Sequence, residues 1–513
     1  MKRNNKTKQS LLLLVSLCSL NITAQEVWNI DQCMAYAVEH NHIVKQRHLE
    51  ADNYRMDRMK AIGQFLPGVS GNVSAQYNFG RSVDPETNTY ISKSTFNNGY
   101  SMEASIPIFR GGSLINQVRK SKANLLLGKA ALQEARDNTA LETFQAYIDA
   151  LYYYGTTRLA KQKLAESDSL LYKTRRQETL GLKGMADVAQ MEAQQASDAY
   201  NLTHQQNLYE TAMLTLKQKM NFPIEEALLL DTCLLEQSTL EQEQLTIEHA
   251  DNVFRLALNC NPVLKQAEMQ KQSANMDRKI SWSSFVPSIS LYGGISSSYY
   301  KELHQTGYPP FHTQFENNFG SYFGISMSIP IFNRLSGIAN MRQARNNYRI
   351  ATEQYEAQKE ELQKLVQQAV QDREGYLKES IQMEKKVASD SLAYHVTRRK
   401  YEEGLMTSLD VQNNAATLLE SQTGLLQSKL TYLMKCRLVD YYKDKIYQKQ
   451  RIKILHTMDI QLEKQKRHSE ETHSLHSRRS CCDFIINLDY FRKSCINTKS
   501  RCRFTEYSRC NLR

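Results

Sequence analysis

The sequence contains no run of about 20 consecutive apolar residues, which is the length that an α-helix needs to cross a lipid bilayer. We therefore expect no membrane-spanning helix in the mature chain. The mature protein is then either soluble or inserted into a membrane by β-strands.

The sequence also lacks the short motifs of common enzyme sites. It contains no HExxH zinc motif, no GxSxG nucleophile turn and no glycine-rich phosphate loop. His40, His42 and His48 are the one cluster that suggests a metal, but their spacing does not bring three ligands to one helix face. We predict no catalytic residue, no cofactor and no metal site.

Net positive charge is missing from the body of the chain, although the formal net charge of the whole is +11. Residues 446–513 hold 15 Lys and Arg against 7 Asp and Glu, and four more positive charges lie before residue 25. The intervening residues are close to neutral, which gives no support for nucleic acid as a partner.

Residues 1–24 have the pattern of a secretory signal. Lys2, Arg3, Lys6 and Lys8 form a basic start, Leu11 to Leu20 an apolar stretch, and Thr23-Ala24 a small-residue cleavage site. Cys18 suggests a lipoprotein, because an acylated cysteine closes the signal of such proteins. Leu17 precedes it, where a small residue is expected, so acylation stays open. We expect an exported protein.

Proline is scarce, with nine residues in 513, and the gaps between prolines predict very long helices. No proline occurs from about residue 114 to 180, which as one helix would extend on the order of 100 Å. Gly181 and Gly184 interrupt the pattern, and a return helix ends before Pro223. A helix is also predicted over about residues 30–62.

Most landmarks of the chain occur twice. The segment around Phe65-Leu66-Pro67 returns around Phe285-Val286-Pro287 at an offset of 220 residues, and Ile106-Pro107-Ile108-Phe109 returns as Ile329-Pro330-Ile331-Phe332 at an offset of 223. Gly181-Leu182 and Asp187-Val188 return as Gly404-Leu405 and Asp410-Val411 at the same offset of 223. A constant offset over separate landmarks indicates a tandem duplication.

Each copy also contains two segments in which apolar and small polar residues alternate. The first copy alternates over about residues 67–80 and 99–109, around a polar loop at 80–98, and the second over about 287–300 and 318–332. Such strands suit a membrane barrel with lipid outside and water inside, and a soluble sandwich would show a similar alternation. We predict that the junctions of strands and helices lie at Pro67, Pro107, Pro287 and Pro330.

These patterns divide the chain into four parts. The signal at 1–24 precedes a first repeat at 25–245, with long helices over about 113–221, and a second repeat at 246–445, with a helix over about 248–282 and long helices over about 334–441. The tail at 446–513 is basic, rich in cysteine and without periodicity, and is predicted to be disordered. Four cysteines, Cys33, Cys233, Cys260 and Cys436, are scattered over the body. They could form two disulfides in an oxidising compartment, but their spacing does not pair them, and we expect separate buried thiols.

The four strands of one chain cannot close a membrane barrel, because the smallest common barrels have eight. The chain must therefore form an oligomer if the strands enter a membrane. A symmetric trimer would supply twelve strands and a water-filled lumen.

The order of these elements resembles the TolC-like outer-membrane efflux proteins over about residues 26–445. The resemblance implies a mainly α protein with membrane β-structure, a homotrimer whose twelve-stranded barrel lies in outer-membrane lipid and continues as a periplasmic α-helical barrel. It further implies a passive exit duct for small molecules that docks to a periplasmic adaptor protein and an inner-membrane pump.

The resemblance places the Gly181–Gly184 and Gly404 turns at the periplasmic tip. Asp187 and Asp410 would then form rings of three carboxylates, or would only cap the return helices. Tyr401 stands where the family often ties helices together, Met406 replaces an expected arginine, and Lys183 could supply the missing charge. Asn413 stands where a second acidic ring is often found.

Two other functions remain open at this point. The chain could be the exit duct of a one-step protein secretion system, which the sequence cannot separate from efflux. A trimeric structural coiled coil would explain the long helices but not the duplicated strand pairs.

Overall fold

The computed structural model describes residues 27–83, 88–236, 249–303 and 307–443, which belong to one compact unit. The predicted signal at 1–24 and the predicted tail at 446–513 lie outside the described residues. Among the described residues, no helix is long and apolar enough to cross a membrane.

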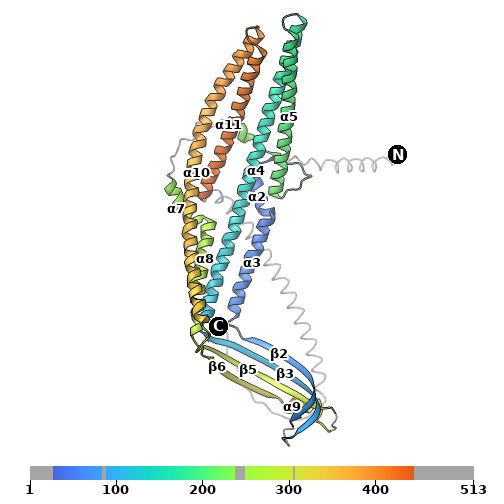
Figure 1. The fold of residues 1–513 in the computed structure, drawn as a ribbon, viewed down its shortest axis with the longest axis vertical. Helices are drawn as coiled ribbons and strands as arrows, with labels where there is room; N and C mark the ends of the chain where they lie inside the picture. Colours follow the sequence, from blue (N-terminus) through green and yellow to red (C-terminus); the bar gives the residue numbers. More distant parts are fainter. Residues whose placement is uncertain (1–26, 84–87, 237–248, 304–306, 444–513) are drawn as a thin grey trace, which may run out of the picture. The chain divides into compact units, whose positions relative to one another are not determined.

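Two helical hairpins and a four-stranded sheet make up the unit (Figure 1). The first hairpin pairs α4 (Ser113–Thr179) with α5 (Met185–Met220), and the second pairs α10 (Ser336–Glu402) with α11 (Ser408–Tyr442). Both α4 and α10 have 67 residues, on the order of 100 Å of helix. The duplication predicted from the sequence is confirmed, because the two copies fold into the same order of elements.

Each long hairpin is preceded by a pair of shorter helices, where the sequence predicted one continuous helix. The first copy has α2 (Ile30–His40) and α3 (His42–Gly63), and the second has α7 (Ala250–Cys260) and α8 (Pro262–Ser281). Asn41 and Asn261 divide the pairs, since the Asn41 Oδ1 accepts a bond of 2.8 Å from Ile43 N and the Asn261 Oδ1 one of 3.0 Å from Leu264 N.

The strands form one antiparallel sheet in the order β2 (Gly68–Val83), β3 (Tyr90–Arg110), β5 (Ser288–Glu302) and β6 (Gly320–Ser328). The central pairing of β3 with β5 joins the two copies. The predicted loop at 80–98 is wrong over most of its length, because β2 continues to Val83 and β3 begins at Tyr90. Hydrogen bonds along the ladder outweigh the polar composition of these residues.

Three of the four prolines flank strands, and the fourth lies inside one. Pro67 and Pro287 directly precede β2 and β5, and Pro330 follows β6. Pro107 lies within β3, where a register shift between Pro107 and Phe109 interrupts the pairing with β5. Its predicted place at the end of the strand is therefore wrong, and a bulge accommodates the missing N–H.

Smaller elements complete the unit and were not predicted. β1 (Val27–Trp28) pairs in parallel with β4 (Leu229–Leu230), and α6 (Cys233–Glu236) follows. A 3-10 turn, η1 (Trp282–Phe285), precedes β5, and the short helix α9 (Phe311–Asn317) lies between β5 and β6. The segment between the two predicted strands of the second copy therefore contains a helix, which begins directly after Pro309-Pro310.

Apolar side chains between the helices form the core. One cluster joins α7, α8, α10 and α11 through Val253, Leu264, Leu362, Val366 and Val439. The spacing of three residues from Leu362 predicts that Leu365 shares the same apolar face of the helix, but Leu365 is 40% exposed instead. The thiol of Cys33 is buried as predicted, whereas Cys233 is exposed.

Candidate functional site: the hairpin tips and the two faces of the sheet

Both hairpins reverse direction through the same turn. Gly181 and Gly404 adopt φ angles of +74° and +80°, which glycine reaches without the steric cost of a side chain. Leu182 N and Leu405 N donate to the carbonyls of Gln177 at 2.9 Å and Lys400 at 2.8 Å. This pattern is a Schellman motif, so the two glycines fix the ends of α4 and α10.

The return helices begin at caps of unequal strength. In the second copy, Thr407 and Asp410 form a capping box, in which Asp410 Oδ2 accepts from Thr407 N at 3.0 Å and Asp410 N donates to Thr407 Oγ1 at 3.3 Å. In the first copy, Gly184 occupies the cap position and offers no side chain. Only the bond of 3.3 Å from Gly184 N to Asp187 Oδ2 remains.

The capping box affects the ionisation of Asp410. Hydrogen bonds from the Thr407 hydroxyl and backbone N–H hold the pKa of the Asp410 carboxyl below its ordinary value. A lowered pKa means that the cap is fully present above the ordinary carboxyl pKa and is lost as the pH falls through the lowered one. Asp410 is therefore an anion at neutral pH.

Tyr401 links the two hairpins. Its side chain is 2% exposed, and its hydroxyl lies 3.0 Å from Thr174 Oγ1 on α4. The ammonium of Lys183, from the first turn, lies 4.3 Å from the centre of the Tyr401 ring. The structure thus brings together two of the residues predicted for the tip, and adds Thr174, which the sequence analysis did not single out.

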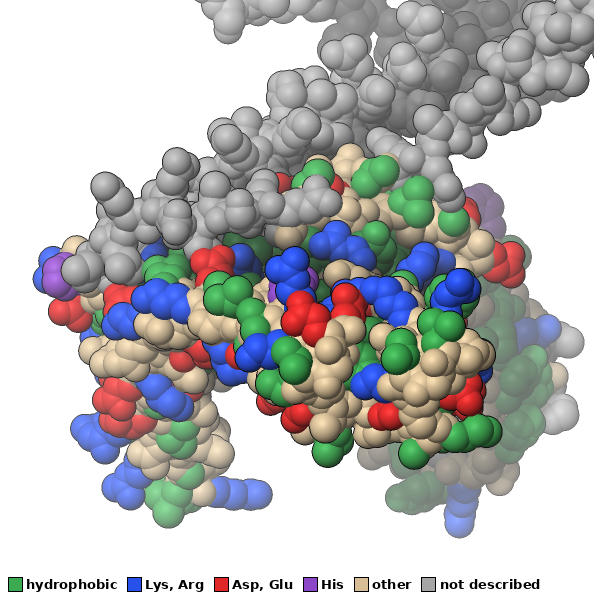
Figure 2. Space-filling model, turned by 90° about the horizontal axis from the view of Figure 1, so that it is seen from above, with side chains coloured by type: hydrophobic (Ala, Val, Ile, Leu, Met, Phe, Trp, Pro, Cys, Tyr) green, Lys and Arg blue, Asp and Glu red, His purple; other side chains and the backbone are tan. Residues whose placement is uncertain are grey.

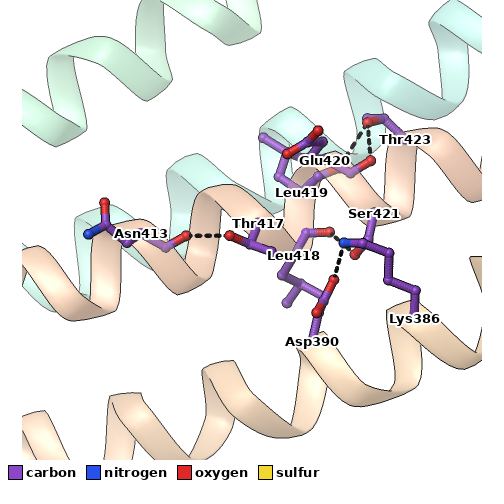
Figure 3. A network of polar contacts seen from close by, with 9 residues as sticks. All are labelled: Lys386, Asp390, Asn413, Thr417, Leu418, Leu419, Glu420, Ser421 and Thr423. Carbon is purple, nitrogen blue, oxygen red and sulfur yellow. Dashed lines mark hydrogen bonds and ion pairs between the residues drawn. The ribbon is translucent and has the colours of Figure 1, made fainter.

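Further polar contacts join the hairpins around Tyr401. Lys173 Nζ lies 2.8 Å from Glu402 Oε1, and Ser408 Oγ donates to Gln190 Oε1 at 2.7 Å. Gln190 stands 223 residues before Asn413, so it is the first-copy equivalent of that predicted site residue. Asn413 itself is exposed, and its backbone carbonyl accepts from Thr417 Oγ1 at 2.9 Å (Figure 3). Equivalent positions therefore have different contacts in the two copies.

The second hairpin also has polar contacts between its own helices. Lys386 Nζ lies 2.7 Å from Asp390 Oδ2 on α10, beside Ser421 of α11 (Figure 3). The bond from Lys386 is the main cause that lowers the pKa of Asp390, and a bond from Ser421 adds to it. The ion pair is on the surface, where such pairs stabilise by less than about 1 kcal/mol.

Apolar packing lies directly beneath these polar contacts. Leu170, Leu171, Met191, Tyr394, Tyr401, Val411 and Ala415 form a buried cluster. Next to it, a cavity of about 150 Å³ lies between α4, α10 and α11, lined partly by Lys163, Glu166 and Tyr394. Burial, and then the nearby Glu166 carboxylate, raises the pKa of Tyr394 to about 12. Tyr394 therefore stays a hydrogen-bond donor to Glu166, at 3.1 Å.

Charges of both signs occur at this end of the hairpins. Figure 2 looks from above, onto the end where the turns lie in Figure 1, and shows Lys and Arg interspersed with Asp and Glu. Asp187 and Asp410 are partly exposed, each at the start of its own helix. The described contacts do not bring these two carboxylates together within one chain.

The sheet has one apolar and one polar face. Residues directly opposite each other in neighbouring strands share a face. The register pairs Val69 with Ala104 and Val73 with Tyr100, so the two alternations read from the sequence fall on the same face. Val69, Val73 and Phe79 are 63%, 70% and 74% exposed, although they are apolar. Isolated soluble domains rarely leave such a surface uncovered.

The sequence profile of the outer membrane efflux protein family matches residues 35–221 and 253–435. The chain belongs to the outer membrane efflux protein family. The two matched segments are the two structural copies, and together they cover well over half of the chain. No curated protein sequence matches significantly.

Solved structures of outer-membrane channels have the same fold. The outer membrane protein VceC of Vibrio cholerae aligns with a TM-score of 0.68 and 15% identity over 81% of this chain and 96% of its own. The CmeC outer membrane channel of Campylobacter jejuni aligns at 0.67 and 16% over 81% and 86%. The MtrE outer membrane channel of Neisseria gonorrhoeae, in its open state, aligns at 0.63 and 20% over 81% and 88%.

These findings confirm the predicted family, the duplicated fold and the location in the outer membrane. The protein is an outer-membrane efflux protein.

Proposed function

We propose that the chain forms a homotrimeric exit duct that exports small molecules passively across the outer membrane. The observation that carries the proposal is the open four-stranded sheet with one apolar face, because β2 and β6 each keep one edge without a strand partner among the described residues. Exposed strand edges favour pairing with another chain. Three copies would close a twelve-stranded barrel with the apolar face toward lipid.

The helical hairpins would continue this barrel as a periplasmic tunnel. Their turns would form its far end, where a periplasmic adaptor protein and an inner-membrane pump would dock. On three-fold symmetry, Asp187 and Asp410 would each provide three carboxylates around the axis, and Asn413 would add a neutral polar ring. Tyr401, Thr174 and Lys183 would hold the two hairpins of one protomer together at this end.

The experiment is a comparison of the two faces of the sheet in the purified full-length protein. Val73→Lys places a charge on the apolar face and should cost about 2–4 kcal/mol of stability in a membrane, whereas Ser74→Lys on the polar face should be tolerated. Trimers on native gels and pores in planar lipid bilayers are the measurements. An equal response of both faces would contradict the barrel.

A pore that conducts ions and exports small dyes with an adaptor and pump would support efflux. Export of a polypeptide instead would assign the chain to a one-step secretion system, with the same barrel.

A further inference from the structure

The middle rows of the polar face of the sheet are almost without charge. Between the row of Gly68 and the row of Gln76, the described residues of this face include one charged side chain, Glu103 of β3. The other residues of these rows are Gly68, Ser70, Asn72, Ser74, Gln76, Asn97, Gly99, Ser101, Ser105, Tyr292, Gly294, Ser296, Ser298, Tyr300, Gly320, Tyr322 and Gly324. A lone carboxylate on a neutral surface has no adjacent cation in these rows to neutralise it.

Two tyrosines lie beside Glu103 on the same face. Each stands directly opposite a glycine of the neighbouring strand, Tyr292 opposite Gly324 and Tyr322 opposite Gly294. A Cβ atom at Gly294 would lie 2.9 Å from the Tyr322 hydroxyl, and one at Gly324 would lie 2.8 Å from the Tyr292 hydroxyl. Both rings therefore lie across the neighbouring strand, in space that only glycine leaves open.

The hydroxyl of Tyr322 reaches past Gly294 to Glu103. It donates a hydrogen bond of 3.1 Å to Glu103 Oε1, which connects β6 to β3 across the whole width of β5. The rings of Tyr292 and Tyr322 are 6.2 Å apart at 56° to each other. They are 42% and 45% exposed, so the rings remain accessible beside the carboxylate.

A carboxylate with two accessible aromatic rings is the chemistry that recognises an organic cation. The carboxylate attracts the positive charge, and the ring faces attract it through their quadrupoles while covering its alkyl groups. An inorganic cation would use the carboxylate but gain less from the rings.

We propose that Glu103, Tyr292 and Tyr322 form a contact site for organic cations on the wall of the strand-lined lumen. The site rests on the proposed function, because the polar face must line the lumen. Three-fold symmetry would place three such sites at one level, which makes Glu103 a determinant of cation preference separate from the helical tip.

The test uses the full-length trimer in planar lipid bilayers, with tetraethylammonium as the probe. Block of the potassium current by tetraethylammonium should weaken about fivefold in Glu103→Gln, because one favourable charge interaction is lost. Glu103→Ser should act in the same direction. The preference for potassium over chloride, measured from reversal potentials, should fall in both variants.

The tyrosine variants separate the rings from the charge. Tyr322→Leu should weaken tetraethylammonium block about threefold and leave the preference for potassium over chloride unchanged, since the carboxylate remains. Tyr322→Phe keeps the ring and should stay close to the wild type. Ser296→Ala, on the same face, is the matched control and should change neither quantity.

Two outcomes would overturn the site. If the wild-type pore conducts and tetraethylammonium blocks it and the Glu103→Gln pore equally, the site is wrong and the exit duct still stands. A wild-type trimer that forms no pore overturns the proposed function and the site with it.

Discussion

At the scale of single residues, Tyr401 is the side chain most firmly placed between the hairpins. Tyr401→Phe removes the hydroxyl at 3.0 Å from Thr174 Oγ1 and keeps the packing of the ring. We expect a loss of about 1 kcal/mol in the free energy of unfolding, because Thr174 is fully buried and loses a partner. Thermal unfolding of the detergent-solubilised protein measures this loss.

Tyr172→Phe is the matched control, because Tyr172 is 68% exposed on α4, the helix that carries Thr174. Equal unfolding temperatures for the two variants would show that the Tyr401 hydroxyl contributes nothing to the tip.

The contacts of single residues could be predicted from the sequence only in part. Tyr401 was marked by its distance from Gly404, but Thr174 gave no signal of its own beyond its duplication as Thr397. The difference arises in three dimensions, since Thr174 lies opposite Tyr401, whereas Thr397 accepts a bond from Asn414 Nδ2 at 3.1 Å. A contact between residues 227 positions apart depends on how the hairpins pack, which local patterns do not encode.

At the scale of elements, the glycine turns determine where the long helices end. Gly404→Ala places a Cβ on a backbone with φ of +80° and should cost about 1 kcal/mol, since only glycine adopts this region freely. The effect should be local, because no other atom lies within 4 Å of the new methyl group. Hydrogen exchange of the amides at the start of α11 measures it.

Gly375→Ala is the control for this substitution. Gly375 lies inside α10 with nothing within 4 Å, so alanine should stabilise the helix by about 1 kcal/mol. If both variants slow hydrogen exchange, the turn does not require a positive φ.

The elements that could be predicted are those with long, regular patterns. The absence of proline and the two glycine turns were enough to predict the long helices α4, α5, α10 and α11. The division at Asn41 was missed because a single cap residue hardly changes helical periodicity, although Asn41 and Asn261 repeat at the same offset of 220 as Pro67 and Pro287.

The helix α9 was missed for a different reason. Its seven residues are held by tertiary contacts, in which Gln314 Oε1 accepts from Tyr300 N at 3.0 Å and Phe311 packs on Tyr299. Segments this short take their structure from the sheet they cover and not from their own periodicity.

At the scale of the whole molecule, the four-stranded sheet and the turns of the helical hairpins have different charge patterns. Between the row of Gly68 and the row of Gln76, the polar face of the sheet holds the single carboxylate of Glu103. The hairpin turns and the helix ends next to them hold Asp187 and Asp410 together with Lys183 and Lys173. An exit duct built from three such chains would have two separate levels of negative charge, one between strands and one between helix ends.

The negative charge at the helix ends can be tested by substitutions that remove the charge and keep the caps of the helices. Asparagine keeps an acceptor oxygen at Asp410 and Asp187 and so retains much of the capping of α11 and α5. Asp410→Asn should therefore leave the trimer assembled and lower the preference of the pore for potassium over chloride in planar bilayers. Adding Asp187→Asn should lower it further, because a second ring of three carboxylates becomes neutral.

Asp168→Asn is the control for this pair, since Asp168 is an exposed carboxylate of α4 away from the turn. It should leave the reversal potential unchanged. An unchanged reversal potential in the double variant as well would limit Asp187 and Asp410 to capping their helices. If the preference for potassium over chloride falls in the double variant but not in Asp168→Asn, and the trimer still assembles, the negative charge at the helix ends belongs to Asp187 and Asp410.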